Sequence, residues 1–173
     1  MPDANQIKEW LVRAKRGDDE AFGLLLKALY KRTFTTIFEV VPCYEDVEEI
    51  LQDSFYRFYR SLKKLREGED PFYFLRRIAI RRAYTHLKRS RRILSLDEIP
   101  EDLPQLTIAG IEMPVKSAYE RAQKLPPKQR MVFLLREVLG ISDGQIAEAM
   151  EITEITVRRH ASLAREALLR GES

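Results

Sequence analysis

Apolar residues at spacings of three and four run through most of this 173-residue chain, and they constrain its fold more than any other feature. That spacing places side chains on one face of an α-helix, whereas a half-buried strand needs strict alternation. The stretch from Val47 to Leu65, for example, keeps one apolar stripe. Strand signals are almost absent. The sequence therefore predicts an all-α protein.

Residues 93–116 interrupt the helical pattern. They contain Pro100, Pro104 and Pro114, and they are acidic on balance. Prolines and charges of one sign favour an extended segment. The length suits one medium domain or two small ones. We therefore predict two small helical domains, residues 1–92 and 117–173, joined by a flexible acidic linker, residues 93–116.

Cysteine content and hydropathy indicate the compartment. Cys43 is the only cysteine, so one chain can form neither an internal disulfide nor a thiolate metal cluster. No run approaches the ~18 to 20 apolar residues that span a bilayer, and the first ten residues lack the pattern of a signal peptide. These features predict a cytoplasmic protein with no membrane span.

Motifs for catalysis and cofactor binding do not occur. The chain has no glycine-rich phosphate loop, and its two histidines, His86 and His160, fall in different predicted domains. The neighbouring carboxylates of Asp18 and Asp19 are explained by helix capping. We therefore expect no enzyme activity, no catalytic residue, no metal and no cofactor.

The net charge of +3 hides an uneven distribution. Residues 76–92 contain eight basic residues and no acidic one, whereas residues 45–53 contain five acidic residues and no basic one. The first segment suits a polyanion and the second a basic partner. Two simpler explanations remain open: a basic helix face can be merely solvated, and carboxylates in the first turn of a helix are stabilised by the helix dipole.

Within the basic segment, cations and one aromatic residue share a side of the helix predicted for residues 72–92. They lie at spacings of four, three and four. Cations contact phosphates, and an aromatic ring can stack on an unpaired base. This face therefore predicts nucleic-acid contact. Its members are Arg77, Arg81, Tyr84 and Lys88.

Residues 142–169 have helix-turn-helix proportions: a short helix, a turn at 151–153 and a longer last helix. One arc of the last helix is apolar and must pack inward. The opposite arc carries residue types that bind guanine edges and phosphates. An amphipathic helix with a solvated basic face is the alternative. The inward arc contains Val157, Ala161, Ala164 and Leu168, and the opposite arc contains Arg158, Arg159, Ser162 and Arg165.

Four motifs, in this order and spacing, resemble the bacterial sigma-70 superfamily. The resemblance extends from about Ile7 to Leu169, and the two-domain length is similar to that of the small extracytoplasmic-function group. The motifs are DVEEILQDSF at 46–55, FYFLRRIA at 72–79 running into LKRSRR at 87–92, LPPKQRMVF at 125–133, and TVRR at 156–159 with Ala164 and Arg165.

This resemblance implies a promoter-specificity subunit of RNA polymerase, with conserved region 2 in the first domain and region 4 in the second. The docking site for the coiled coil of the largest core polymerase subunit would comprise Asp46, Glu49, Gln52 and Asp53. The melted −10 strand would be held by the loop 64–72 and by Arg77, Arg81, Tyr84 and Lys88. The −35 element would be read by Thr156, Arg158, Arg159, Ser162 and Arg165.

Further partners follow from the same resemblance. The second domain would meet the flap of the second-largest subunit, and the protein would bind promoter DNA both as duplex and as single strand. An anti-sigma factor is also expected, as is association with the nucleoid in the holoenzyme. In this family the acidic linker threads toward the active-site channel.

The chain departs from the family pattern at several positions. Arg81 and Thr85 stand where Asn and Asp are common, so the −10 preference does not transfer. Leu163 replaces a basic residue of the last helix, which alters the expected −35 contacts. Glu151 occupies a turn position that usually holds Gly. A left-handed conformation there would cost roughly 1 to 2 kcal/mol, unless the turn differs.

Two other functional classes remain open. A helix-turn-helix regulator that binds DNA without polymerase would account for residues 154–169 but not for the acidic and basic helices. A sigma-like adaptor that binds only another protein would account for the acidic face but not for either set of arginines.

Overall fold

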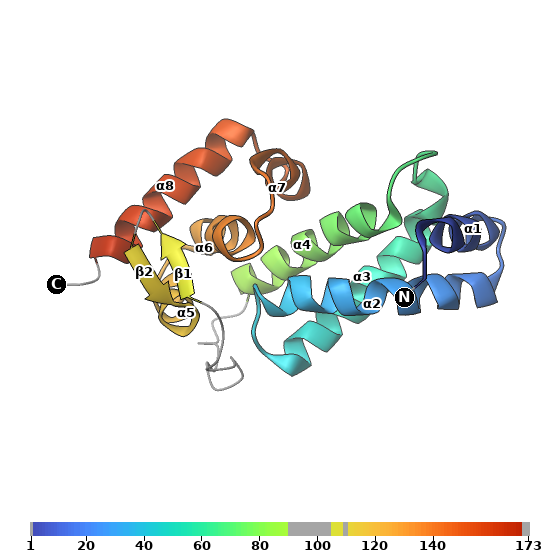
Figure 1. Ribbon diagram of the computed structural model, residues 1–173, viewed down its shortest axis with the longest axis horizontal. Coiled ribbons are helices and arrows are strands. Elements are labelled where there is room, and N and C mark those ends of the chain that lie inside the picture. Colours follow the sequence, from blue (N-terminus) through green and yellow to red (C-terminus); the bar gives the residue numbers. More distant parts are fainter. Residues whose placement is uncertain (1, 90–104, 109–110, 171–173) are drawn as a thin grey trace.

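The computed structural model describes residues 2–89, 105–108 and 111–170. Helices account for nearly all of the regular structure, as predicted (Figure 1). The first half contains α1 (Ala4–Lys15), α2 (Asp19–Phe38), α3 (Tyr44–Ser61), a 3-10 turn η1 (Leu62–Lys64) and α4 (Pro71–Arg89). The second half contains α5 (Val115–Gln123), α6 (Pro127–Phe133), a π-helical turn η3 (Leu134–Val138), α7 (Asp143–Met150) and α8 (Glu154–Arg170).

Local sequence explains where the first helices begin. Asp3 and Gln6 form a reciprocal capping box at the start of α1. The carboxylate of Asp18 accepts a hydrogen bond of 2.9 Å from the backbone N–H of Ala21 and so caps α2. Between the two helices, Gly17 has a φ of +93°. A glycine adopts this left-handed conformation without steric cost, and it follows the end of α1.

The prediction of an extended linker is wrong for residues 105–108 and 111–116. Strands β1 (Gln105–Ile108) and β2 (Ile111–Pro114) form a two-stranded antiparallel hairpin, and residues 115 and 116 belong to α5. Met113 and Val115 are buried in the core, and this burial stabilises the hairpin. Its strands are too short to produce a recognisable pattern in the sequence. Pro114 stands at the end of the ladder, where its missing N–H is tolerated. Residues 93–104 of the predicted linker lie outside the described residues.

Buried side chains form two clusters. One lies among α1 to α4 and is built around Phe58 and Leu75. The other is shared by both halves of the chain, because Ile80 and Ala83 of α4 belong to the same cluster as Met131 of α6. Helix α4 packs against both α6 and α7 (Figure 1). The two helical units are therefore in contact through α4.

The turn between α7 and α8 brings these helices into helix-turn-helix geometry. Glu151 closes α7 with φ 56° and ψ 45°, the only positive φ of a non-glycine residue in the described chain. Thr153 then accepts a hydrogen bond of 3.2 Å from the backbone N–H of Thr156 and caps α8. Ser142 accepts one of 3.4 Å from the N–H of Gln145 and caps α7. The left-handed conformation at Glu151 is thus present despite its cost.

Candidate polymerase and nucleic-acid interfaces

The predicted docking residues on α3 fall into two pairs. Glu49 and Gln52 are exposed. Asp53 instead accepts a hydrogen bond from Arg57 at 3.0 Å and forms an ion pair with Arg82 of α4. The side chain of Asp46 is only 13% exposed, and its Oδ2 lies 3.3 Å from Nε2 of His86 in α4. Asp46 and Asp53 therefore face α4, whereas Glu49 and Gln52 are open to solvent.

The predicted DNA-binding side of α4 is also divided. Arg77 forms an ion pair with Glu148 of α7. Arg81 donates hydrogen bonds from Nε and Nη2 to the carbonyl oxygens of Ala149 and Glu148, at 3.0 and 3.2 Å. It also forms a 3.1 Å ion pair with Glu151. Two of the four predicted residues thus face the second helical unit.

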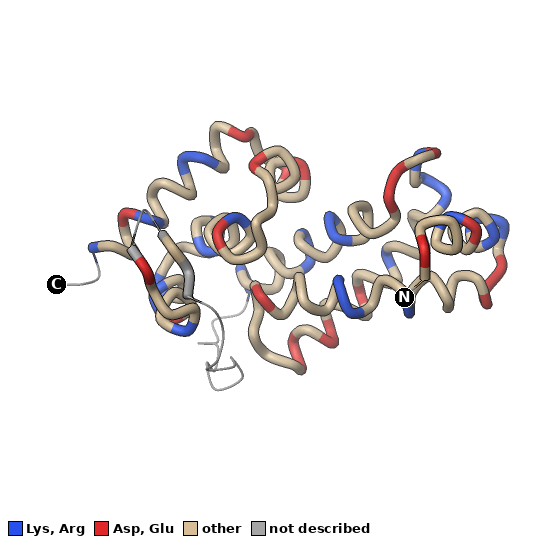
Figure 2. Tube along the Cα trace, viewed as in Figure 1, with Lys and Arg blue, Asp and Glu red and all other residues tan. Residues whose placement is uncertain are grey.

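The remaining two lie nearer the end of α4. Tyr84 is half-buried against the shared core, and this burial raises the pKa of its phenol. Lys88 is exposed, and its ammonium lies 5.2 Å from the centre of the Tyr84 ring, within range of a cation–π contact. Blue segments recur along α4 in Figure 2.

An open groove between α3 and α4 extends this basic surface. Its lining carries cations and one exposed tyrosine but no carboxylate. Sequence reasoning missed the contribution of α3, although Tyr56 and Arg60 at a spacing of four share a helix face just as the α4 residues do. The lining residues are Tyr56, Arg57, Arg60, Ser61, Lys64, Ile78, Arg81 and Arg82.

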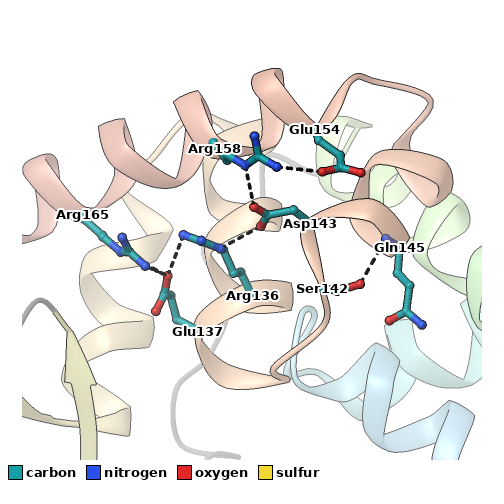
Figure 3. Close-up of polar contacts among 8 residues, drawn as sticks. All are labelled: Arg136, Glu137, Ser142, Asp143, Gln145, Glu154, Arg158 and Arg165. Atoms are coloured by element: carbon teal, nitrogen blue, oxygen red, sulfur yellow. Dashed lines mark hydrogen bonds and ion pairs between the residues drawn. The ribbon is translucent and has the colours of Figure 1, made fainter.

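The inward arc of α8 is confirmed, since Val157, Ala161, Ala164 and Leu168 are all buried. On the outer side, Arg158 donates hydrogen bonds to Asp143 at 3.2 Å and to Glu154 at 2.8 Å. The guanidinium therefore already has partners, although 59% of the side chain remains exposed (Figure 3).

Arg165 is engaged in the same way farther along α8. Its Nη2 donates a 2.5 Å hydrogen bond to Glu137. Arg136 links the two arginine sites, because its guanidinium lies 2.9 Å from Asp143 and 3.6 Å from Glu137 (Figure 3). A continuous network of arginines and carboxylates thus fixes α8 against the preceding helices.

Other side chains of α8 point away from that network. Arg159 and Ser162 are exposed. The hydroxyl of Thr156 lies 2.8 Å from that of Thr153 in the cap. Ile155, which sequence reasoning did not single out, is 75% exposed. Burial, with the nearby charges of Lys128 and Arg159, lowers the pKa of His160.

Comparison with known families follows the same division of the chain. Residues 23–93 match the family model described as Sigma-70 region 2, and residues 116–168 match that described as Sigma-70, region 4. The chain belongs to the sigma-70 family. Region 2 thus covers α3 and α4, and region 4 covers α5 to α8 almost to its end.

Curated relatives narrow the family assignment. The RNA polymerase sigma-H factor of Pseudomonas aeruginosa is 32% identical over 183 residues, which cover 97% of this chain and 94% of the relative. The ECF RNA polymerase sigma-E factor of Salmonella typhimurium is 30% identical over 171 residues, which cover 90% of this chain and 88% of the relative. The chain is thus an extracytoplasmic-function member, and this membership gives it a role in transcription initiation.

Solved structures share the fold. CnrH, solved in complex with the cytosolic domain of CnrY, has a TM-score of 0.66 at 22% sequence identity. The match covers 99% of this chain and 100% of the CnrH chain. The sigma factor RpoE of Bartonella quintana, solved with the anti-sigma factor NepR, has a TM-score of 0.57 at 15% sequence identity. The match covers 86% of this chain and 94% of the RpoE chain. Among the residues described, no helix has the length and apolarity to cross a membrane.

Proposed function

We propose that this protein binds core RNA polymerase and directs it to promoters that carry −35 and −10 elements, where it promotes melting of the DNA. The observation that carries the proposal is the order of surfaces along one chain. An acidic exposed face on α3 and a basic face on α4 lie within region 2, and a helix-turn-helix lies within region 4. A free DNA-binding regulator would use only the last of these.

The docking site on polymerase comprises Asp46, Glu49, Gln52 and Asp53. Glu49 and Gln52 contact the coiled coil of the largest subunit directly, because their side chains are exposed. Asp53 ties α3 to α4 through its ion pair with Arg82, and Asp46 lies beside His86 of α4. Electrostatic complementarity of this kind sets the orientation of docking more than its affinity.

The −10 strand binds along α4, through Arg77, Arg81, Tyr84 and Lys88, and along the basic groove on α3. Unstacking bases costs a few kcal/mol, which contacts to the trapped bases offset. Arg77 and Arg81 are occupied by α7 in this structure, so α4 and α7 separate when the strand binds. Two weak DNA-binding units tethered on one polymerase then act at high effective concentration.

The −35 element is bound by α8. Arg159, Thr156 and Ser162 face the bases. Arg158 and Arg165 use donors left over from their ion pairs to contact phosphates, because a guanidinium has five N–H groups. The region 4 unit also meets the flap of the second-largest subunit. An anti-sigma factor regulates the protein, as the neighbours solved with CnrY and NepR suggest, and in the holoenzyme the protein is associated with the nucleoid.

Binding of the fluorescently labelled protein to purified bacterial core polymerase, at one fixed salt concentration, tests this proposal. We expect tight binding that the Glu49→Ala/Gln52→Ala variant weakens about tenfold, equivalent to roughly 1.4 kcal/mol. Asp53 is left intact because its loss would also disturb the α3–α4 contact. The matched control is Asn5→Ala/Glu9→Ala, which removes one amide and one carboxylate from an exposed face of α1.

The control should bind like the wild type. Absence of binding by the folded wild-type protein would refute the proposal and favour the polymerase-independent DNA-binding regulator. Binding without start-site-specific transcription from promoter templates would favour the adaptor.

A further inference from the structure

The first turns of α8 present an apolar side chain to solvent. Ile155, the second residue of the helix, is 75% exposed and is the most exposed large hydrophobic residue in the described chain. Isolated apolar residues on a surface are common and need no explanation by themselves. The position of Ile155 relative to its polar neighbours is what gives it meaning.

Ile155, Arg159 and Ser162 form one ridge on α8. Their spacings of four and three residues place them on the same side of a helix that turns about 100° per residue. The ridge is nearly opposite the buried arc centred on Val157 and Ala164, so it points away from the protein. All three residues of the ridge are exposed.

The two other outward arginines lie to one side of this ridge. Arg158 and Arg165 lean toward the preceding helices, where Asp143 and Glu137 hold them (Figure 3). Reorienting either guanidinium toward a base would break an ion pair with a carboxylate that is no more than 17% exposed and would leave Arg136 as its remaining arginine partner. Contact of Ile155 with a base breaks no ion pair or hydrogen bond, because its side chain has no polar group.

We propose that Ile155 contacts the C5-methyl group of a thymine in the −35 element, close to a guanine contacted by Arg159. This inference rests on the proposed function and adds a specificity-determining residue to it. In the major groove the thymine methyl is the apolar group among the base edges, and residues near the start of a recognition helix reach those edges. Four residues of helix rise about 6 Å, so the thymine and the guanine lie about two base pairs apart.

Replacement of thymine by uracil tests the contact, because it removes the methyl group and nothing else. Holoenzyme assembled from this protein and purified core polymerase first selects duplexes from a pool randomised across the −35 element. Each thymine of the selected element is then replaced singly by deoxyuridine, and the affinity of the holoenzyme is measured. At one position we expect a loss of about fourfold, the value of one buried methyl-sized group.

Variants then assign that loss to Ile155. Ile155→Ala should weaken binding to the thymine duplex by a similar factor and be insensitive to uracil at that position. Leu163→Ala is the matched control, because it truncates another exposed apolar side chain of α8 and should keep the full uracil penalty. Unchanged core binding and an unchanged thermal midpoint will show that Ile155→Ala folds normally.

The inference is overturned if no thymine is selected, if no position is sensitive to uracil, or if Ile155→Ala keeps the full penalty. These outcomes leave the proposed function intact, since the holoenzyme still selects promoters. A holoenzyme that forms but enriches no sequence would instead overturn the proposed function and this inference with it.

Discussion

Arg81 of α4 donates a hydrogen bond of 3.0 Å to the carbonyl oxygen of Ala149 in α7, 68 positions away along the chain. The acceptor lies near the end of the first helix of the helix-turn-helix, and the donor belongs to the helix proposed to hold the −10 strand. Part of the surface proposed to bind the −10 strand is therefore in contact with the second unit.

Charge reversal at Glu148 should loosen this contact. Glu148→Lys replaces the ion-pair partner of Arg77 by a cation beside both Arg77 and Arg81. Because an exposed ion pair contributes only about 0.2 to 1 kcal/mol, and repulsion adds a similar amount, we expect partial opening of the α4–α7 interface. A larger radius of gyration in small-angle X-ray scattering would measure it.

Glu166→Lys provides the control for that experiment. It makes the same charge change at an exposed position of α8 whose ion-pair partner, Arg170, lies on the same helix. The control should scatter like the wild type. Equal radii for both variants would mean that the contacts left intact, apolar packing and the polar contacts of Arg81, suffice to hold the two units together.

Tyr119 should make stability depend on pH at the alkaline end. Its buried hydroxyl lies 2.5 Å from both the carbonyl oxygen and Oε2 of Glu39, and burial, reinforced by the Glu39 carboxylate, raises its pKa above the ordinary value of 10.0. The folded state therefore keeps a proton that the unfolded state loses above pH 10. The stabilising contribution of the Tyr119 phenol to the folded state is complete below pH 10. Above pH 10 the free energy of unfolding falls by up to about 1.4 kcal/mol per pH unit.

Urea unfolding of Tyr119→Phe between pH 8 and 11 measures this slope. Because the variant lacks the hydrogen bond, its free energy of unfolding at pH 8 should be about 0.5 to 1.5 kcal/mol lower than that of the wild type. Above pH 10 its free energy of unfolding should fall less steeply with pH than that of the wild type. Tyr73→Phe, at an exposed tyrosine, should keep the wild-type slope. Parallel slopes for Tyr119→Phe and the wild type would contradict the prediction.

Asp143 should be a stability determinant of region 4. Its carboxylate, 17% exposed, pairs with Arg136 at 2.9 Å and with Arg158 at 3.2 Å. Asp143→Ala removes this carboxylate partner of Arg136, whose side chain is half-buried. We expect this substitution to lower the free energy of unfolding by about 1 to 3 kcal/mol in chemical unfolding. Glu166→Ala breaks only an exposed pair within α8 and should cost less than about 0.5 kcal/mol.

The left-handed Glu151 offers a stabilising substitution. Glu151→Gly relieves the backbone cost at φ 56° but removes the ion pair with Arg81, so we expect a net gain of up to about 1 kcal/mol in unfolding free energy. Gln145→Gly, at an exposed position inside α7, should instead destabilise by roughly 0.5 to 1 kcal/mol. A destabilised Glu151→Gly would show that its carboxylate outweighs the backbone strain.

Local chemistry made much of the architecture predictable. The caps at Asp18, Ser142 and Thr153 and the buried arc on α8 depend on a residue's own helix or on neighbours three to four positions away. The sigma-70 assignment likewise followed from motifs that are contiguous in sequence. The hairpin was missed because its short strands are supported by burial of Met113 against distant helices, which no local pattern reports.

By itself, therefore, the sequence determined the helical class, the division into two units, the family and the residue types available for binding. The tertiary structure alone decided which of those residues have intramolecular partners. Arg77 and Arg81 bind α7, and Arg158 and Arg165 bind the helices before α8, whereas Ile155 and Arg159 point outward. The physical reason is that an ion pair depends on distances of a few Å between atoms, and packing brings together residues that are far apart in the chain.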